Sequence, residues 1–243
     1  MPATPNSAAE RLRSALLRVI ELREGLKADK AVLQRWHAVK RWQSRRLEQT
    51  YADLLASPRF DAACRFFLDE IYGPRDFAQR DREALRVAPK LARLLPERAV
   101  ETMAHGVELD ALSETLDARV AEHVDARIDA HGYCKAYVLA GTRSEREQQI
   151  ATVDAIGRSL ERLARVPLLS TMLHVMRGPA EAASLGHLHR FLATGFDAFQ
   201  SMGAAGTFLD TVRTRETALM KRVFDGEVPA EWNDLGAIPV ETD

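Results

Sequence analysis

The chain of 243 residues contains two cysteines, few aromatic residues at 7% of the total, and no apolar run near the roughly 18 residues that suggest a membrane-spanning helix. Cys64 and Cys134 match neither a disulfide framework nor a zinc-ligand spacing, so we interpret both as buried thiols in a reducing compartment. The amino-terminal stretch lacks the apolar segment of a secretory signal. We therefore expect a cytoplasmic protein with no membrane span.

The sequence also lacks the short motifs of common enzyme classes. It has no Gly-x-Ser-x-Gly elbow, no glycine-rich phosphate loop ending in Lys-Ser or Lys-Thr, and no Glu-x-x-His pair of the kind that di-iron bundles repeat. Glu101, His105 and Glu108 would share a face of one continuous helix. The apolar residues change sides around Gly106, however, which predicts a break there. We therefore expect no catalytic residue, no metal site and no cofactor.

Helical periodicity is present along nearly the whole chain, and no segment shows the alternation of a strand. Ser7 and Glu10 form a capping box that begins a helix near 8–26. A second helix, about 40 Å long, follows near 29–56. We expect these two helices to form an antiparallel hairpin.

A second capping box, at Ser144 and Glu147, predicts the start of a later helix. The inner face of that helix carries Ile150, Val153 and Gly157 at helical spacing.

The composition predicts one folded unit. Apolar residues make up 46% of the chain and charged residues 28%, and no Gly/Ser/Pro-rich linker divides it. We predict a single all-α domain over residues 1–243, a bundle of about nine or ten helices with the amino-terminal hairpin at one end. Residues 1–6 are expected to be disordered, and residues 226–243 to form an extended acidic tail, part of which Trp232, Leu235 and Ile238 could fasten to the bundle.

One short segment stands out by its composition. FFLDEIY, Phe66 to Tyr72, is followed by Gly-Pro and by the charged run RDFAQRDRE. It resembles the signature of a group of uncharacterised bacterial proteins that is named for a Phe-Phe-Leu-Glu-Glu-Leu-Tyr motif. Here Asp69 replaces the first Glu and Ile71 the second Leu. The resemblance covers residues 66–81 and implies an uncharacterised bacterial family, without an activity or cofactor.

The chemistry of this segment favours a joint between two helices. Gly73 and the proline after it end the first helix. The acidic and basic side chains on either side can pair across the turn and fix the angle between the helices. Paired carboxylates also serve acid/base catalysis, but neighbouring residues of a helix point about 100° apart, which weakens that alternative. The residues of this predicted joint are Phe66, Phe67, Asp69, Glu70, Tyr72, Gly73, Asp76, Arg80 and Asp81.

A small-ligand pocket is a second possibility. LLSTMLHVM, residues 168–176, is apolar nearly all round, which predicts the most buried helix of the fold. His174 within it could face a haem-type planar ligand, with His187 or His189 on the other side. A lone histidine on an apolar face is more often a hydrogen-bonded core residue.

The charge is unevenly distributed. Residues 1–46 hold eleven Lys/Arg and four Asp/Glu, a net charge of +7, whereas the remaining 197 residues hold 23 against 31, a net charge of −8. One side of the second helix and the residues before it form a candidate anion-binding face for phosphates or nucleic acid. Internal pairing with acidic segments is the alternative. The candidate residues are Lys27, Lys30, Arg41 and Arg45.

The leading hypothesis from sequence is a non-enzymatic helical protein that binds a protein partner or a second copy of itself. A filled interior would favour such interaction surfaces. An enclosed polar cavity would instead favour a small ligand or an enzyme.

Overall fold

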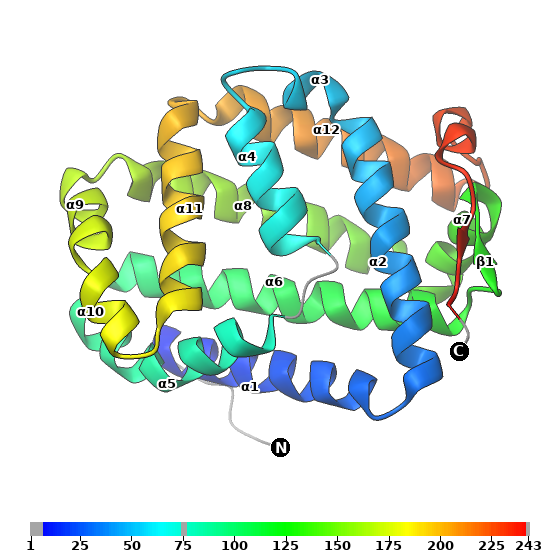
Figure 1. Cartoon of the computed structure of the whole chain (residues 1–243). Helices are drawn as coiled ribbons and strands as arrows, with labels where there is room; N and C mark the ends of the chain where they lie inside the picture. Colours follow the sequence, from blue (N-terminus) through cyan, green and yellow to red (C-terminus); the bar gives the residue numbers. More distant parts are fainter. Residues whose placement is uncertain (1–6, 74–76, 242–243) are drawn as a thin grey trace.

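The computed structural model describes residues 7–73 and 77–241, and within these ranges the fold is all-α, as the sequence predicts (Figure 1). The expected disorder of residues 1–6 and the role assigned to Asp76 lie outside the described residues. The helices of the first half are α1 (Ala8–Lys27), α2 (Lys30–Thr50), α3 (Ala52–Leu55), α4 (Asp61–Phe66), the π-helix η1 (Phe67–Ile71), α5 (Ala78–Leu94) and α6 (Glu97–Glu122).

The second half adds six α-helices, a short 3-10 helix and a sheet of two short strands. These elements are α7 (Ala130–Ala140), α8 (Arg143–Ala164), α9 (Pro167–Val175), α10 (Arg177–Ala182), α11 (Gly186–Met202), α12 (Gly206–Phe224), the 3-10 helix η2 (Ala230–Leu235), and the strands β1 (Arg127–Ile128) and β2 (Ile238–Pro239). The described residues thus form twelve α-helices. The excess over the nine or ten expected comes from helices of four to six residues, such as α3 and α10.

The first two helices do not form the antiparallel hairpin expected from sequence. The capping box of Ser7 and Glu10 begins α1 as predicted. However, α1 lies along α6, and α2 runs across α6 rather than back along α1 (Figure 1). The reason lies in α2, because its buried Trp36 and Trp42 belong to a core cluster formed mainly with α6, α7 and the carboxy-terminal segment, to which α1 adds Leu26 near its end.

The long helix α6 runs through Gly106 without the predicted break. Its apolar face changes sides because its neighbours change along its length. Near its start, Val100 and Ala104 pack with residues of α1 and α5. Near its end, Val120 packs with residues of α2 and α7. The helix is therefore central, with α1 on one side and α8 on another (Figure 1).

The carboxy-terminal segment is packed against the bundle, whereas the sequence suggested an extended tail. Strand β2 pairs antiparallel with β1, and Ile238 opposite Ile128 is buried. Trp232 of η2 is also buried, with its ring edge-on to Trp42 at 5.4 Å between centroids. These apolar anchors outweigh the acidic character of the segment, since burying one such side chain contributes about 1.5–3 kcal/mol.

The apolar helix α9 is not the most buried helix, so that prediction was wrong. Leu168 and Val175 are 67% and 69% exposed. Helix α9 lies at one end of the molecule, where its main contacts in the described part of the chain are with α8, α10 and α11 (Figure 1). No helix among the described residues is long and apolar enough to cross a membrane.

Candidate ligand-binding site

The FFLDEIY segment ends in a π-helix that forms one wall of an internal cavity. The amide of Tyr72 donates to the carbonyl of Phe67 at 2.9 Å, five residues earlier, which is the hydrogen bond of a π-helix. Such wide turns occur often at functional sites. The wide turn places Phe67, Leu68 and Tyr72 on the cavity wall.

Glycine is required where this turn ends. A Cβ atom on Gly73 would lie 2.7 Å from the backbone oxygen of Asp69, closer than a carbon atom can approach. Phe66, which precedes the π-helix, packs instead against α11, where a Cβ atom on Gly195 would lie 2.6 Å from its ring. The two adjacent phenylalanines therefore face different neighbours. Phe66 packs against α11, and Phe67 lines the cavity.

The cavity has a volume of about 110 Å³ and lies between α2, η1, α6, α7, α8 and α12. An engineered apolar cavity of about 150 Å³ admits benzene, so the space suits a small organic molecule. Its apolar wall is formed by Leu47, Cys64, Phe67, Leu68, Ile150, Val153, Phe208, Leu209 and Val212. Its polar wall includes Gln43, Arg46, Tyr51, Tyr72, Ser113, Asp117, Tyr133, Tyr137, Arg146, Gln149, Asp154 and Glu216.

Three arginines line this cavity, and Arg146 of α8 is more deeply buried than Arg46 or Arg213. Only 2% of Arg146 is exposed. Its guanidinium lies over the ring of Tyr137, 4.0 Å from the centroid, and its Nη1 donates to Oε1 of Gln149 at 3.2 Å. Its Nε and Nη2 have no hydrogen-bond partner among the described residues, and no described carboxylate lies within salt-bridge distance. The protein therefore leaves two donors of a buried positive charge unsatisfied.

Tyr133 adds a neutral donor to the same polar wall. Its ring stacks on Trp42 with centroids 3.9 Å apart, which fixes its position. Its hydroxyl accepts a hydrogen bond from Nε2 of Gln43 at 3.1 Å, and the described residues provide no acceptor for its own hydrogen. Burial raises the pKa of the Tyr133 hydroxyl, so the group stays protonated at neutral pH.

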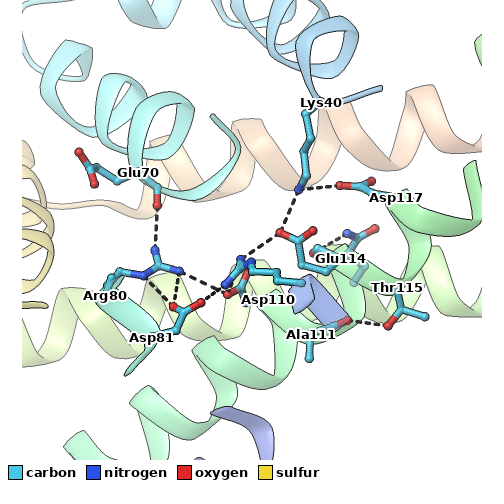
Figure 2. A network of polar contacts seen from close by, with 12 residues as sticks. Lys40, Glu70, Arg80, Asp81, Asp110, Ala111, Glu114, Thr115 and Asp117 are labelled. Atoms are coloured by element: carbon cyan, nitrogen blue, oxygen red, sulfur yellow. Dashed lines mark hydrogen bonds and ion pairs between the residues drawn. The ribbon is translucent and has the colours of Figure 1, made fainter. Parts of the chain in front are cut away.

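A buried ionic network adjoins this polar wall through Asp117 (Figure 2). Lys40 of α2 lies between Asp117 and Glu114 of α6, at 2.8 and 3.2 Å. Burial alone would lower the pKa of Lys40, but Asp117 and Glu114 raise it above its ordinary value, so the ammonium stays charged. Oδ1 of Asp117 also accepts from Gln43 at 2.8 Å. Through Gln43, the network holds the hydroxyl of Tyr133 in place.

The same network reaches α1 and α5. Arg23 of α1 pairs with Asp81 of α5, with Asp110 at 2.9 Å and with Glu114 at 3.0 Å. Burial opposes the ionisation of Glu114, yet Lys40 and Arg23 hold the pKa of its carboxyl below the ordinary value. The buried cations of this network are therefore neutralised by carboxylates, unlike Arg146.

The segment predicted to be a joint connects η1 to α5, and residues 74–76 of its turn lie outside the described residues. Nη1 of Arg80 donates to the backbone oxygen of Glu70 at 3.1 Å, rather than pairing across the turn with its carboxylate (Figure 2). The guanidinium of Arg80 also contacts Asp81 at 3.1 Å and Asp110 at 3.5 Å. Asp69 is exposed. The joint thus fastens η1 to the ionic network.

The three histidines considered for a ligand pocket lie outside the lining of the cavity. His174 has a side chain that is 62% exposed and bonds the backbone oxygen of Ser170 at 2.9 Å. His187 contacts the buried carboxylate of Glu83 at 3.0 Å. His189 bonds the backbone oxygen of Leu173 at 2.7 Å. Each of them therefore bonds a carbonyl or carboxylate oxygen of the protein.

The residues of the predicted basic face differ in their surroundings. Lys27, Lys30 and Arg45 are exposed. Arg41 instead contacts the carboxy-terminal segment, with Pro239 O and a Glu241 carboxylate oxygen each at 3.4 Å.

Glu101, His105 and Glu108 of α6, which the sequence brings to mind as metal ligands, form no such cluster in the described structure. Glu101 and His105 are exposed, and Glu108 pairs with Arg11 of α1 at 2.8 Å. In the described part of the chain, no group of three or more His, Cys, Asp or Glu side chains is placed to hold a metal ion.

Sequence reasoning missed Arg146. The residue stands in the charged run RSEREQQ, where it resembles a solvated arginine. A signal was present, because Arg146 precedes Ile150, Val153 and Gly157 by four, seven and eleven residues and so shares their helical face. A cation on an otherwise inward-facing stripe is the pattern to look for.

Comparison with known proteins gives a family without a function. A family model described as Domain of unknown function (DUF8198) matches residues 22–230, a span that includes the FFLDEIY segment and every residue of the cavity wall. No curated protein and no solved structure matches the chain.

Proposed function

The chain belongs to the family described as Domain of unknown function (DUF8198), and we propose that it binds a small organic anion in the internal cavity. The observation that carries the proposal is the buried guanidinium of Arg146, whose Nε and Nη2 lack partners. Removing an unpaired charge from water costs several kcal/mol, which an anion in the adjacent cavity would offset.

The alternative without a ligand is that stacking on Tyr137 alone offsets the burial of Arg146. A cation over an aromatic ring gains about 2 kcal/mol when desolvated, which is less than the penalty for burying the charge. The rest of the fold treats buried cations differently: Arg23 and Lys40 each contact at least two carboxylates. This contrast favours a ligand as the missing anion.

Binding is better supported than covalent chemistry. Cys64 is the thiol on the cavity wall, and burial raises its pKa to about 11, so little thiolate exists at neutral pH. Glu216 is engaged by Nη1 of Arg46 at 2.6 Å and by the hydroxyl of Tyr51 at 2.7 Å. The wall therefore offers oriented donors rather than an activated nucleophile.

Thermal unfolding in a panel of organic anions tests the proposal. A ligand at about a hundred times its Kd adds about 2.7 kcal/mol of stability, which corresponds to roughly 5–10 °C in Tm for a chain of this size. We expect this rise for the wild type and for Arg143→Gln, an exposed control on the same helix. Arg146→Gln should lose it. An equal rise in Arg146→Gln would contradict the proposal.

A second candidate function is association with a protein partner or a second copy through α9 and α10. Leu168, Met172, Val175 and Met176 are apolar and at least 40% exposed within nine residues of chain. A contiguous apolar surface of this kind is typical of interaction sites.

Light scattering after size exclusion tests this second candidate for self-association. We expect a dimer mass for the wild type and for Leu139→Glu, which alters an exposed apolar residue of α7 at the other end of the molecule. Val175→Glu should give a monomer. A monomeric wild type at high protein concentration would remove the case for a second copy.

A further inference from the structure

The geometry points to an amphipathic monocarboxylate as the ligand: its carboxylate binds Arg146 and Tyr133, and its apolar body extends along α8 towards Phe208 and Leu209. This inference rests on the proposed anion site and adds the chemical class of the ligand. Three features support it, namely the shape of the free donor pair, the separation of polar and apolar walls, and the charge at the far end.

The two unpartnered nitrogens of Arg146 are those that suit a carboxylate. Nε and Nη2 lie on the same edge of the guanidinium plane, so their hydrogens point in parallel at two acceptors. The same fold shows this pairing elsewhere: Nε and Nη2 of Arg11 donate to the two carboxylate oxygens of Glu108 at 3.0 and 2.8 Å. A carboxylate ligand would complete the same fork, and the Tyr133 hydroxyl would donate a third hydrogen bond.

Polar side chains of the cavity wall gather around Arg146. Gln149 is one turn along α8 from Arg146, and its Nε2 donates to Oγ of Ser113 at 2.8 Å. Val153 lies about 10 Å from Arg146 along the helix axis, because each residue rises about 1.5 Å. Beyond it, a Cβ atom on Gly157 would lie 2.2 Å from Cδ2 of Leu209, so α12 closes the far end tightly.

The part of the cavity wall formed by η1 and α12 is largely apolar and aromatic. The rings of Phe67 and Phe208 stack there with centroids 5.9 Å apart. Both side chains line the cavity together with Leu209 and Val212. A ligand that reaches from Arg146 to these rings therefore needs an apolar body, and the volume of about 110 Å³ limits it to a short unbranched chain such as that of hexanoate.

The charge at the far end disfavours a second carboxylate. Asp154, eight residues after Arg146 on α8, also lines the cavity, and its buried Oδ1 has no partner among the described residues. Its other oxygen accepts from Nε of Arg158 at 2.9 Å. Arg213 of α12, which also lines the cavity, is half-exposed and pairs with Asp210 at 3.4 Å. A dicarboxylate would bring its second negative charge towards the carboxylate of Asp154. The site should therefore select a single negative charge.

Isothermal titration of the full chain with four matched compounds tests the inference. Hexanoate has both the carboxylate and the body, acetate lacks the body, hexanamide lacks the charge, and hexanedioate adds a second charge. We expect hexanoate to bind at least about a hundredfold more tightly than acetate, from the burial of four methylenes. It should bind at least about tenfold more tightly than hexanamide and hexanedioate.

Two variants separate the parts of the claim. Arg146→Gln should weaken hexanoate and acetate alike, whereas Val153→Phe, which fills the apolar part, should weaken hexanoate by about tenfold and leave acetate unchanged. Val153→Ile is the milder form should the larger ring disturb folding. Equal affinities for hexanoate and acetate would overturn the inference and leave the anion site standing. No binding of any carboxylate would overturn both.

Discussion

At the scale of single residues, the fold contains two kinds of buried cation. Arg23 and Lys40 are held by carboxylates from α5 and α6, and these partners keep both cations charged. Arg146 is buried to the same degree but has an aromatic face and an amide as its partners. An unpaired buried charge destabilises the folded state. Removing the charge of Arg23 should therefore lower stability, because its carboxylates lose their partner, whereas removing that of Arg146 should leave stability unchanged or raise it.

The substitution Arg146→Met tests this difference. It removes a charge without stranding a partner carboxylate, so the ligand-free protein should keep its free energy of unfolding to within about 1 kcal/mol or become more stable. Arg23→Met is the matched comparison, and it should lose about 3–5 kcal/mol because it strands buried carboxylates. Urea unfolding of both variants measures the free energies. A loss in Arg146→Met as large as that in Arg23→Met would mean that Arg146 is a structural residue.

At the scale of elements, the π-helix η1 is the device that turns the FFLDEIY segment into a cavity wall. It is followed at once by Gly73, where the chain passes too close to Asp69 for a side chain. Gly25, near the end of α1, has no atom within 4 Å of the place where a Cβ would lie. A side chain therefore fits at Gly25 but clashes with the backbone at Gly73.

The pair Gly73→Ala and Gly25→Ala tests this close approach. Gly73→Ala should lower the free energy of unfolding by about 1–3 kcal/mol, because the added methyl meets backbone that cannot move aside. Gly25→Ala should raise it by up to about 1 kcal/mol, because alanine favours the helix. Urea denaturation compares the two. If Gly73→Ala were as stable as Gly25→Ala, the tight turn described here would be wrong.

A second feature at this scale is the attachment of α11 to α5 through Glu83. No side chain caps the start of α11 from its own preceding residue. Instead, Oε2 of Glu83 accepts from the amide of Leu188 at 2.8 Å, and Oε1 contacts His187. Burial opposes the ionisation of Glu83, but Leu188 and His187 hold its pKa below the ordinary value.

This lowered pKa gives stability a defined pH dependence. A carboxylate with a lowered folded pKa stabilises the fold above its unfolded pKa of about 4.3, and that contribution is lost as the pH falls through the folded value. Glu83→Gln should therefore be less stable than the wild type by about 1–2 kcal/mol at pH 7, with the difference shrinking below about pH 4. Urea unfolding across this range measures it. The exposed Glu181→Gln serves as control, and a Glu83→Gln deficit independent of pH would refute the assignment.

Much at this scale was predictable from local pattern, and the errors have physical causes. The first capping box is where the sequence places it. The second is formed by Thr142 and Glu145, two residues before the predicted pair, because both stretches carry the same Ser/Thr-x-x-Glu spacing. The break at Gly106 was wrong because a reversal of apolar face also arises when a continuous helix changes neighbours.

At the scale of the whole molecule, the all-α class follows from periodicity, whereas the cavity does not. Its wall joins residues as distant as Gln43 and Glu216, and pairing between distant helices is not encoded in any local spacing. The exposure of α9 was missed for the same reason, since apolar composition alone does not say where a helix lies. The ionic network behind the cavity likewise joins α1, α2, α5 and α6 (Figure 2).

The assembled molecule therefore presents oriented polar groups and an apolar surface within one cavity. Lys40, Asp117 and Gln43 fix the Tyr133 hydroxyl, and Tyr137 fixes the Arg146 guanidinium by stacking. Donors held in place before a ligand arrives reduce the entropy lost on binding. The central claim is that this preorganised pair receives a carboxylate.

The most direct test observes the Nε–H group of Arg146 by nitrogen–proton correlation spectroscopy while hexanoate is added. The assignment comes from Arg146→Lys, in which that resonance is absent. We expect the Nε–H proton of Arg146 to move downfield and saturate with the ligand, as a hydrogen bond to carboxylate requires. A resonance of Arg146 that stays in place while hexanoate binds, or through the whole titration, would contradict the account.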